Sequence, residues 1–158
     1  MNKAIWKTYT FWIVLAEAVG LISGYLTRAE TRVYAEMIQK PSLAPPGWVF
    51  PVVWTVLYAL MGIGAARVYL TPASPARSRG LNLFVTQLAV NFLWSPIFFN
   101  ARAYGFAFVW LLLLWSLVLL MILQFRKVDN TAALFQIPYL LWLTFAAYLN
   151  WAVWQLNR

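Results

Sequence analysis

Five long apolar runs, separated by short polar segments, dominate the pattern of this chain. They cover residues 8–27, 48–69, 81–101, 104–125 and 131–154. Each has about 20 residues or more, enough at about 1.5 Å per residue of helix to cross a hydrocarbon core of about 30 Å. Runs such as FVWLLLLWSLVLLMILQF do not alternate as membrane β-strands do. The pattern predicts an all-α membrane protein, a single domain over residues 1–158 built as a bundle of five transmembrane helices.

Composition supports a lipid environment. Hydrophobic residues make up 63% of the 158 residues and charged residues only 10%, more apolar surface than a water-soluble domain of this length can bury. The first run follows a positively charged start, MNKAIWK, as in a signal peptide. It is too long for the apolar part of a signal peptide, contains Glu17 and ends without a cleavage pattern, so we expect an uncleaved helix.

The residue inventory argues against conventional catalysis and metal binding. The chain has no cysteine and no histidine, which removes thiolate nucleophiles and the commonest metal ligand. Its four acidic residues form no pair at helical spacing within the apolar runs. We therefore predict no catalytic residue and no metal ligand.

The net charge of +8 does not indicate a nucleic-acid partner, because the twelve basic residues are spread over loops and ends. Five helices place seven of them on the amino-terminal side and five on the other. This weakly favours a cytoplasmic amino terminus.

The connection over residues 28–47 is the longest, and it leads into KPSLAPPGWVFPVVW at residues 40–54. Pro45 and Pro46 favour extended backbone, and Pro51 falls in the first turn of the second helix, where its missing N–H costs nothing. A stiff segment of this kind is suited to a lid over the bundle mouth. Alternatively the prolines only start the helix and Trp48 anchors it at the membrane interface.

Polar and aromatic side chains share faces of the second and third predicted helices. At helical spacing these faces carry Trp54, Tyr58, Met61 and Ala65, and Gln87, Asn91, Trp94 and Phe98. Amides in hydrocarbon need partners, so Gln87 and Asn91 are expected inside the bundle. The two faces either form a ligand site with a few polar donors or pack helix against helix.

The fifth helix has an aromatic face with small residues, and Pro138 is expected to kink it. Trp142, Phe145, Ala146 and Leu149 share that face, which leaves room for a flat ligand or for a neighbouring helix.

Glu17 lies near the midpoint of the first helix, where a charged carboxylate costs on the order of 3 kcal/mol. It is expected to be neutral or paired, either in proton coupling or ligand contact, or in a protonated hydrogen bond to a neighbouring helix. Ala16, Gly20 and Gly24 form a seam of small residues that admits another helix, from this chain or from a second copy.

These pieces, in this order, resemble the TspO/MBR family of translocator proteins and tryptophan-rich sensory proteins, also called peripheral-type benzodiazepine receptors. The resemblance is carried by KPSLAPPGWVFPVVWTVLYALMG, QLAVNFLWSPIFF and PYLLWLTFAAYLN. It implies a bacterial-type, multi-pass protein of the cell membrane, often a homodimer, with a pocket beneath the first loop. Such pockets receive porphyrins and aromatic drug-like ligands.

Carried over residue by residue, the resemblance implies a binding site in this chain. Trp54 and Asn91 correspond to polar contacts with a ligand carbonyl. The pocket walls and the lid supply the remaining candidates: Tyr58, Trp94, Trp142, Ala146, Leu149, Phe50, Pro45 and Tyr34.

Some positions depart from the family pattern. Family members often have Trp-Tyr before the KP, whereas this chain has Val33 and Tyr34, and some have an aromatic residue where Leu43 stands. Tryptophan near the lid is linked in the family to light-driven porphyrin breakdown, so its absence counts against that activity. The cholesterol-type pattern of animal members is also missing from LNWAVWQLNR.

The leading interpretation is a membrane receptor or sensor for tetrapyrroles such as protoporphyrin or haem, with no required cofactor. Arg32 or Lys40 is expected to meet the propionates. Haem iron would lack its usual axial ligands, so recognition of the ring is favoured over haem chemistry. The alternatives are a light- and oxygen-dependent porphyrin-degrading enzyme and a porphyrin transporter.

Overall fold

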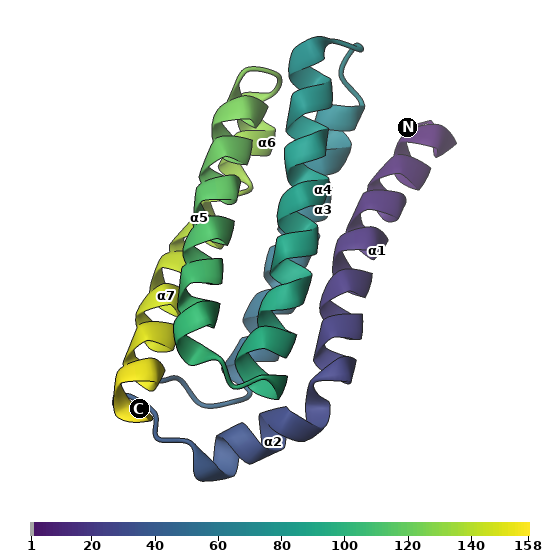
Figure 1. The fold of residues 1–158 in the computed structure, drawn as a ribbon. Coiled ribbons are helices and arrows are strands. Elements are labelled where there is room, and N and C mark those ends of the chain that lie inside the picture. The colour runs from purple at the N-terminus through teal and green to yellow at the C-terminus, as the bar shows by residue number, and fades with distance from the viewer. Residues whose placement is uncertain (1) are drawn as a thin grey trace.

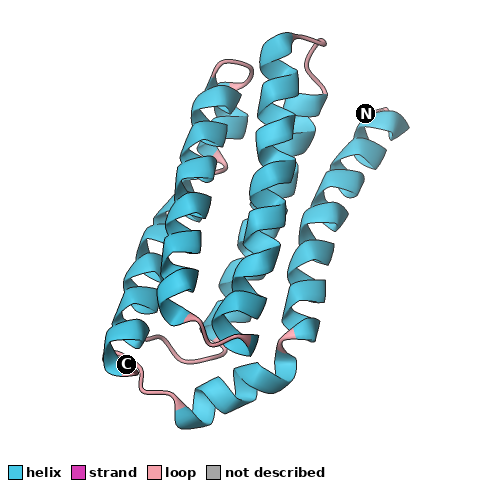
Figure 2. Ribbon diagram, viewed as in Figure 1, coloured by secondary structure: helices cyan, strands magenta, loops and turns pink. Residues whose placement is uncertain are grey.

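The computed structural model describes residues 2–158 as helices joined by short loops (Figures 1 and 2). Five segments of this described part are long and apolar enough to cross a membrane, which confirms the predicted five-helix bundle. In chain order the elements are α1 (Lys3–Leu26), α2 (Arg28–Met37), α3 (Val49–Tyr69), α4 (Pro75–Ser95), the π-helix η1 (Pro96–Asn100), α5 (Tyr104–Arg126), α6 (Asn130–Leu134) and α7 (Ile137–Leu156).

The helices begin where capping residues allow, and this shifts several predicted bounds. Asn2 accepts a hydrogen bond from the N–H of Ala4, so α1 starts at Lys3 rather than near residue 8. Ser74 accepts from the N–H of Arg77 with Pro75 in the first turn, so α4 starts six residues before the predicted 81. A charged flank ends an apolar run without ending the helix.

The segment predicted as a lid loop, residues 28–47, contains the helix α2, which the sequence analysis did not predict. In Figure 1, α2 lies across the end of the bundle opposite the amino terminus, leading from α1 towards the carboxyl terminus. The Lys40 ammonium donates to the carbonyl oxygens of Ala35 and Ile38, at 2.9 and 3.1 Å, and so satisfies carbonyls at the end of α2. Half of the ten residues of α2 are polar and interrupt the apolar ones, so no apolar run predicted this helix.

Prolines disturb two of the transmembrane helices. Pro96 has no N–H, and the chain continues α4 as the π-helix η1, in which the N–H of Ala101 donates to Pro96 O at 2.9 Å. The predicted fifth helix is interrupted after Leu134, and Pro138 stands in the first turn of α7. The interruption follows Leu134, the residue whose carbonyl Pro138 cannot pair with because it has no N–H, so the expected disturbance of the helix is found there.

Helices α1 and α3 pack closely because glycine removes side chains from their seam. A Cβ on Gly62 would lie 2.7 Å from the backbone nitrogen of Ile13, and one on Gly20 would lie 2.7 Å from Cδ2 of Tyr58. Gly24, by contrast, faces open space. The seam of small residues is therefore used within the chain at Gly20, and α1 is held against α3 over several turns.

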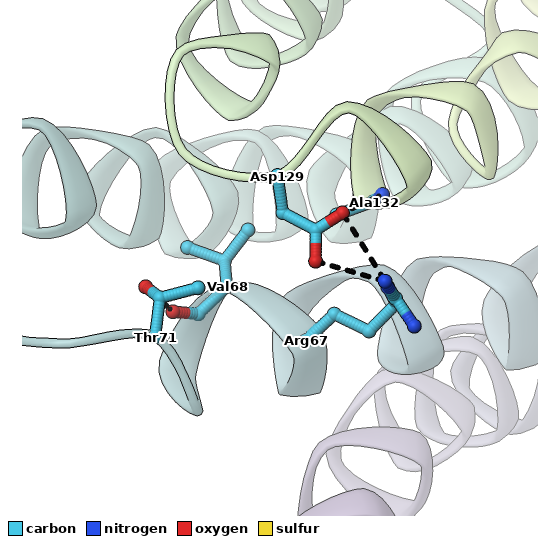
Figure 3. Close-up of polar contacts among 5 residues, drawn as sticks. All are labelled: Arg67, Val68, Thr71, Asp129 and Ala132. Carbon is cyan, nitrogen blue, oxygen red and sulfur yellow. Dashed lines mark hydrogen bonds and ion pairs between the residues drawn. The ribbon is translucent and has the colours of Figure 1, made fainter.

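An ion pair joins α3 to the start of α6 (Figure 3). Arg67 Nη2 lies 3.0 Å from Asp129 Oδ2, while Asp129 Oδ1 accepts from the N–H of Ala132 and caps α6. The two side chains are only partly exposed, at 35% and 17%. This contact fixes the bundle at the end opposite α2.

Candidate functional site

A chain of buried hydrogen bonds crosses the bundle between α3, α4 and α7. The Tyr58 hydroxyl donates to Asn91 Oδ1 at 2.5 Å, and Asn91 Nδ2 donates to the Tyr139 hydroxyl at 2.8 Å. Tyr139 donates to Gln87 Oε1 at 2.7 Å, and Gln87 Nε2 lies 3.9 Å from the Met61 sulfur. All five side chains are at most 7% exposed. The predicted inward direction of Asn91 and Gln87 is confirmed, and both amides find partners on other helices.

Aromatic rings flank this chain on the side of α3 and α7. Trp54 lies against two members of the hydrogen-bond chain, with its ring centre 5.4 Å from that of Tyr58 and 6.1 Å from that of Tyr139. Trp142 lies between Phe50 and Phe145, at 5.9 and 5.6 Å between ring centres. These distances are typical of interacting aromatic pairs. The indole nitrogen of Trp142 is sealed from solvent and has no hydrogen-bond acceptor.

A second aromatic cluster lies beneath α2. The Trp94 and Phe98 rings are stacked with centres 4.8 Å apart, and the Tyr34 ring meets the Phe98 ring edge-on at 5.4 Å. Trp94 Nε1 donates to Asn150 Oδ1 at 3.1 Å, while Asn150 Nδ2 donates to the backbone oxygen of Tyr104 at 2.9 Å. The π-helix η1 carries Phe98 into this cluster, so the irregular turn has a packing consequence.

Two polar attachments hold the α2 segment across the bundle end. Glu30 of α2 forms an ion pair with Arg102, with 3.0 Å between Oε2 and Nη2. The backbone of Arg102 has a positive φ of 50°, which is uncommon for residues other than glycine. Beyond α2, the N–H of Gln39 donates to Asn157 Oδ1 and Asn157 Nδ2 donates to Gln39 O, at 3.1 and 2.8 Å. The α2 segment is therefore attached both to the loop that precedes α5 and to the end of α7.

The ten predicted site residues lie in several different places in the structure. The hydrogen-bond chain contains Tyr58 and Asn91, and the Trp54 ring lies against Tyr58. The Phe50 ring contacts Trp142, and the cluster beneath α2 contains Tyr34 and Trp94. Ala146 and Leu149 lie on α7 beyond Trp142, half-buried and 9% exposed respectively. Pro45 is half-buried in the loop before α3.

Three polar residues of this region were missed by the sequence analysis. They are Tyr139 in the hydrogen-bond chain, Asn150 beneath Trp94, and Gln136 at the break before α7. Tyr139 and Asn150 lie at helical spacing from the predicted face of the fifth helix, three residues before Trp142 and four after Ala146. Extending that face to its polar members would have found both.

Two shallow depressions of the bundle surface lie away from these residues. One, of about 620 Å³, runs along α1. The other, of about 410 Å³, lies between α1 and α4 beside Leu15, Val85 and Phe92. Neither hollow is lined by any of the ten predicted site residues. At the candidate site the rings of Phe50 and Trp142, and those of Trp54 and Tyr58, lie against one another.

Comparison with known proteins agrees with this architecture. The model of the TspO/MBR family matches residues 12–155. The "Tryptophan-rich protein TspO" of Chlorobaculum tepidum is 39% identical over 158 residues, 99% of each chain. The "Tryptophan-rich sensory protein" of Cereibacter sphaeroides is 37% identical over 76% of this chain and 74% of its own. The human "Translocator protein" is 41% identical over 77% and 73%.

A bundle of five apolar helices with a polar and aromatic interior defines an integral, multi-pass membrane protein in a lipid bilayer. The chain belongs to the TspO/MBR family, and the resemblance drawn from its motifs is confirmed.

Proposed function

We propose that this protein is a membrane receptor or sensor that binds tetrapyrroles, such as protoporphyrin or haem, and aromatic drug-like molecules between α3, α4 and α7. Its family includes relatives named as translocator and sensory proteins, which supports a receptor or sensor role. The proposed site is the region of Trp54, Asn91 and Trp142, where flat rings surround a short polar chain.

The unpartnered indole N–H of Trp142 carries this proposal. It is a donor closed off from solvent, and leaving such a donor unpaired costs about 1–3 kcal/mol. Aromatic rings border it on both sides, at Phe50 and Phe145. A flat ligand with a carbonyl or carboxylate oxygen would stack on those rings and give the N–H its acceptor.

The hydrogen-bond chain limits the number of hydrogen bonds that a ligand can form with Asn91. Its Oδ1 already accepts from Tyr58 and its Nδ2 already donates to Tyr139, so one N–H and one lone pair are left. Binding through Asn91 therefore adds a hydrogen bond to an ordered group. Such preorganisation lowers the ordering cost of binding.

The contact between Phe50 and Trp142 is the place where the site would open. Phe50 lies at the start of α3, directly after the loop that contains Pro45, and its ring meets Trp142 of α7 at 5.9 Å. Helices α3 and α7 touch each other sparsely, whereas α3 packs closely on α1. Moving Phe50 with its loop would expose the Trp142 indole without breaking the α1–α3 seam.

Carboxylates on the ligand need a cation at the α2 end. Lys40 is engaged by the two carbonyl oxygens of α2 and lies 5.2 Å from the Tyr34 ring centre, and Arg102 is engaged by Glu30. Arg32 is exposed on α2 and is the better candidate of the two residues named from the sequence. An arginine fork also matches carboxylate geometry.

Titration of protoporphyrin against tryptophan fluorescence, in detergent or lipid, tests the proposal. Trp142→Phe keeps an aromatic ring and removes the N–H. We expect it to weaken binding by about tenfold, the equivalent of about 1.4 kcal/mol. Trp151→Phe changes a tryptophan that is 46% exposed on the same helix and serves as the matched control. Equal affinities of both variants and the wild type, or no saturable binding by the wild type, would contradict the proposed site.

The surroundings of the protein follow from the same family likeness. We infer a bacterial cell membrane, because a relative from Chlorobaculum tepidum matches this chain over nearly its full length. We also infer pairing of two copies through lipid-facing helices, which present large exposed apolar side chains such as Leu21 and Val109.

A further inference from the structure

Positive charge is concentrated at one end of the bundle. The amino terminus, the loop from α3 to α4 and the loop from α5 to α6 lie at this end, opposite α2 (Figure 1). It carries seven basic residues and one acidic residue, Asp129, which pairs with Arg67. The α2 end carries five basic and two acidic residues. Six basic side chains of the first end have no acidic partner among the described residues: Lys3, Lys7, Arg77, Arg79, Arg126 and Lys127.

Helix α1 exposes more of its apolar surface than the other membrane-spanning segments do. Only 17% of its most apolar window is buried within the protein, against 28–39% in the other four segments. Phe11 and Val14, in its amino-terminal half, are 59% and 58% exposed. Lipid therefore contacts a large part of this half of α1.

Two shallow depressions join into one path on this surface. The first is lined by α1 between Trp6 and Ala18, the second by α1 and by residues 85–93 of α4, and Leu15 lines both. We call this path, over residues 6–19 of α1 and 85–93 of α4, the α1 groove. Its part along α1 spans about 20 Å at a rise of about 1.5 Å per residue. One leaflet of a hydrocarbon core is about 15 Å thick, so the groove is long enough for an acyl chain.

Lys7 stands at the outer end of the α1 groove. Of the residues that line the groove, only Lys7 is charged. Helical spacing places Val14 and Ala18 on its face of α1, and Lys3 lies one turn further out. Trp6, beside Lys7, is 56% exposed, as is typical of tryptophan at a membrane interface. A lysine at this depth extends its ammonium group to the headgroups while its methylene stem covers apolar surface.

We propose that the α1 groove binds an anionic glycerophospholipid. One acyl chain lies along Phe11, Val14 and Leu15, and the phosphate group meets the ammonium groups of Lys7 and Lys3. Lysine binds phosphate as a point charge, and the excess of positive charge at this end favours a headgroup with net negative charge. The charge count also favours the cytoplasmic side for this end, and anionic lipids are found in that leaflet.

Charge also favours a lipid over a second copy of the chain on this face. Two-fold pairing brings the same surface patch of each copy together. Pairing through the outer part of the groove would therefore bring Lys7 towards Lys7 of the other copy, at the same depth in the membrane. An anionic headgroup balances this charge, whereas a second copy adds to it.

Native mass spectrometry of the purified protein counts the lipid that stays bound. The protein is incubated in detergent with equal amounts of phosphatidylglycerol and phosphatidylcholine that have the same acyl chains. We expect the wild type to retain phosphatidylglycerol preferentially. Lys7→Gln should weaken this binding about fivefold, the contribution of one basic residue near an anionic surface. Lys127→Gln removes an exposed charge at the same end but outside the groove and is the control.

Filling the α1 groove tests the place of the acyl chain. Val14→Trp puts a large ring into the groove and should lower the retention of phosphatidylglycerol. Val109→Trp puts the same ring at a position of α5 that is 61% exposed, and it should retain the lipid as the wild type does. All four substituted side chains are exposed, so we expect unchanged unfolding temperatures.

Each outcome decides the proposal. Equal retention of the two lipids by the wild type would overturn it. Equal losses in Lys7→Gln and Lys127→Gln would also overturn it, because the charge of the whole end would then act without a defined site. Unchanged retention in Val14→Trp would remove the groove, and lipid-free dimers that Val14→Trp separates would assign this face to a second copy. The measurement contains no porphyrin, so it stands or fails separately from the proposed function.

Discussion

The Tyr58 hydroxyl and the Asn91 side chain are joined by a 2.5 Å hydrogen bond that ties α3 to α4 inside the bundle. Each residue is 7% exposed. Hydrocarbon surrounds the helices, so neither group has water as an alternative partner. This hydrogen bond therefore stabilises the packing of α3 on α4, and the same two residues belong to the proposed binding site.

Replacing Asn91 should destabilise the protein. Asn91→Leu keeps the branched shape of the side chain but leaves the Tyr58 donor and one acceptor position of Tyr139 unpaired, which should lower the free energy of unfolding by about 1–3 kcal/mol. Thermal unfolding in detergent measures the change. Asn82→Leu, at an exposed position of the same helix, is the control. Equal unfolding temperatures for Asn91→Leu and the control would show that the hydrogen-bond chain contributes little.

The α1–α3 seam gives a matched pair of glycine substitutions. Gly62→Ala forces a methyl group against the backbone of Ile13, and overpacking of this kind costs about 1–3 kcal/mol. Gly24→Ala adds the same methyl group to open space on α1 and should be neutral or slightly stabilising, because alanine favours helix. We expect unfolding temperatures to separate the two variants. A Gly62→Ala protein as stable as Gly24→Ala would mean that α1 shifts at no cost.

Much of the fold was predictable because lipid imposes a simple rule. Each membrane-spanning helix needs an apolar run, so the five spans and the inward direction of Gln87 and Asn91 followed from the sequence. Helix α2 did not, because it lies across the bundle end, where no minimum apolar length applies. It is held by contacts from distant segments, such as Arg102 to Glu30 and Asn157 to Gln39.

The candidate site was predictable in its residue types but not in its connections. Helical spacing brought Trp54 and Tyr58 onto one face, yet it did not show that Tyr139 would complete the chain between Asn91 and Gln87. Which residues meet across a bundle depends on the rotation of each helix. Breaks such as the π-helix after Ser95 and the interruption before Ile137 change that rotation locally.

The ion pair in Figure 3 allows capping to be separated from charge. Asp129→Asn keeps an oxygen that can cap Ala132 but removes the negative charge that faces Arg67. Asp129→Ala removes both. We expect Asp129→Ala to lower the free energy of unfolding by about 1–2 kcal/mol more than Asp129→Asn does. The difference should survive added salt, because the cap is not an interaction between two charges. Equal losses in the two variants would assign the whole effect to the ion pair.

Docking of α2 should weaken at alkaline pH through Tyr34. Burial, with a smaller contribution from Tyr104, raises the pKa of Tyr34 from 10.0 to about 12. A released Tyr34 loses its proton near pH 10 and a docked one near pH 12, so the contribution of Tyr34 is complete below pH 10. It is lost as the pH rises to about 12. Tyrosinate absorbance measures this: the difference between wild type and Tyr34→Phe should titrate near pH 12.

The exposed tyrosine at the end of α1 provides the comparison for that titration. Tyr25 is 63% exposed, and Tyr25→Phe removes a tyrosine without touching the cluster beneath α2. Hydrogen exchange of the α2 amides should also accelerate between pH 10 and 12 in the wild type beyond the intrinsic effect of pH, and less so in Tyr34→Phe. A Tyr34 difference titration centred near pH 10 would mean that the ring is not held between Phe98 and Phe99, as the structure places it.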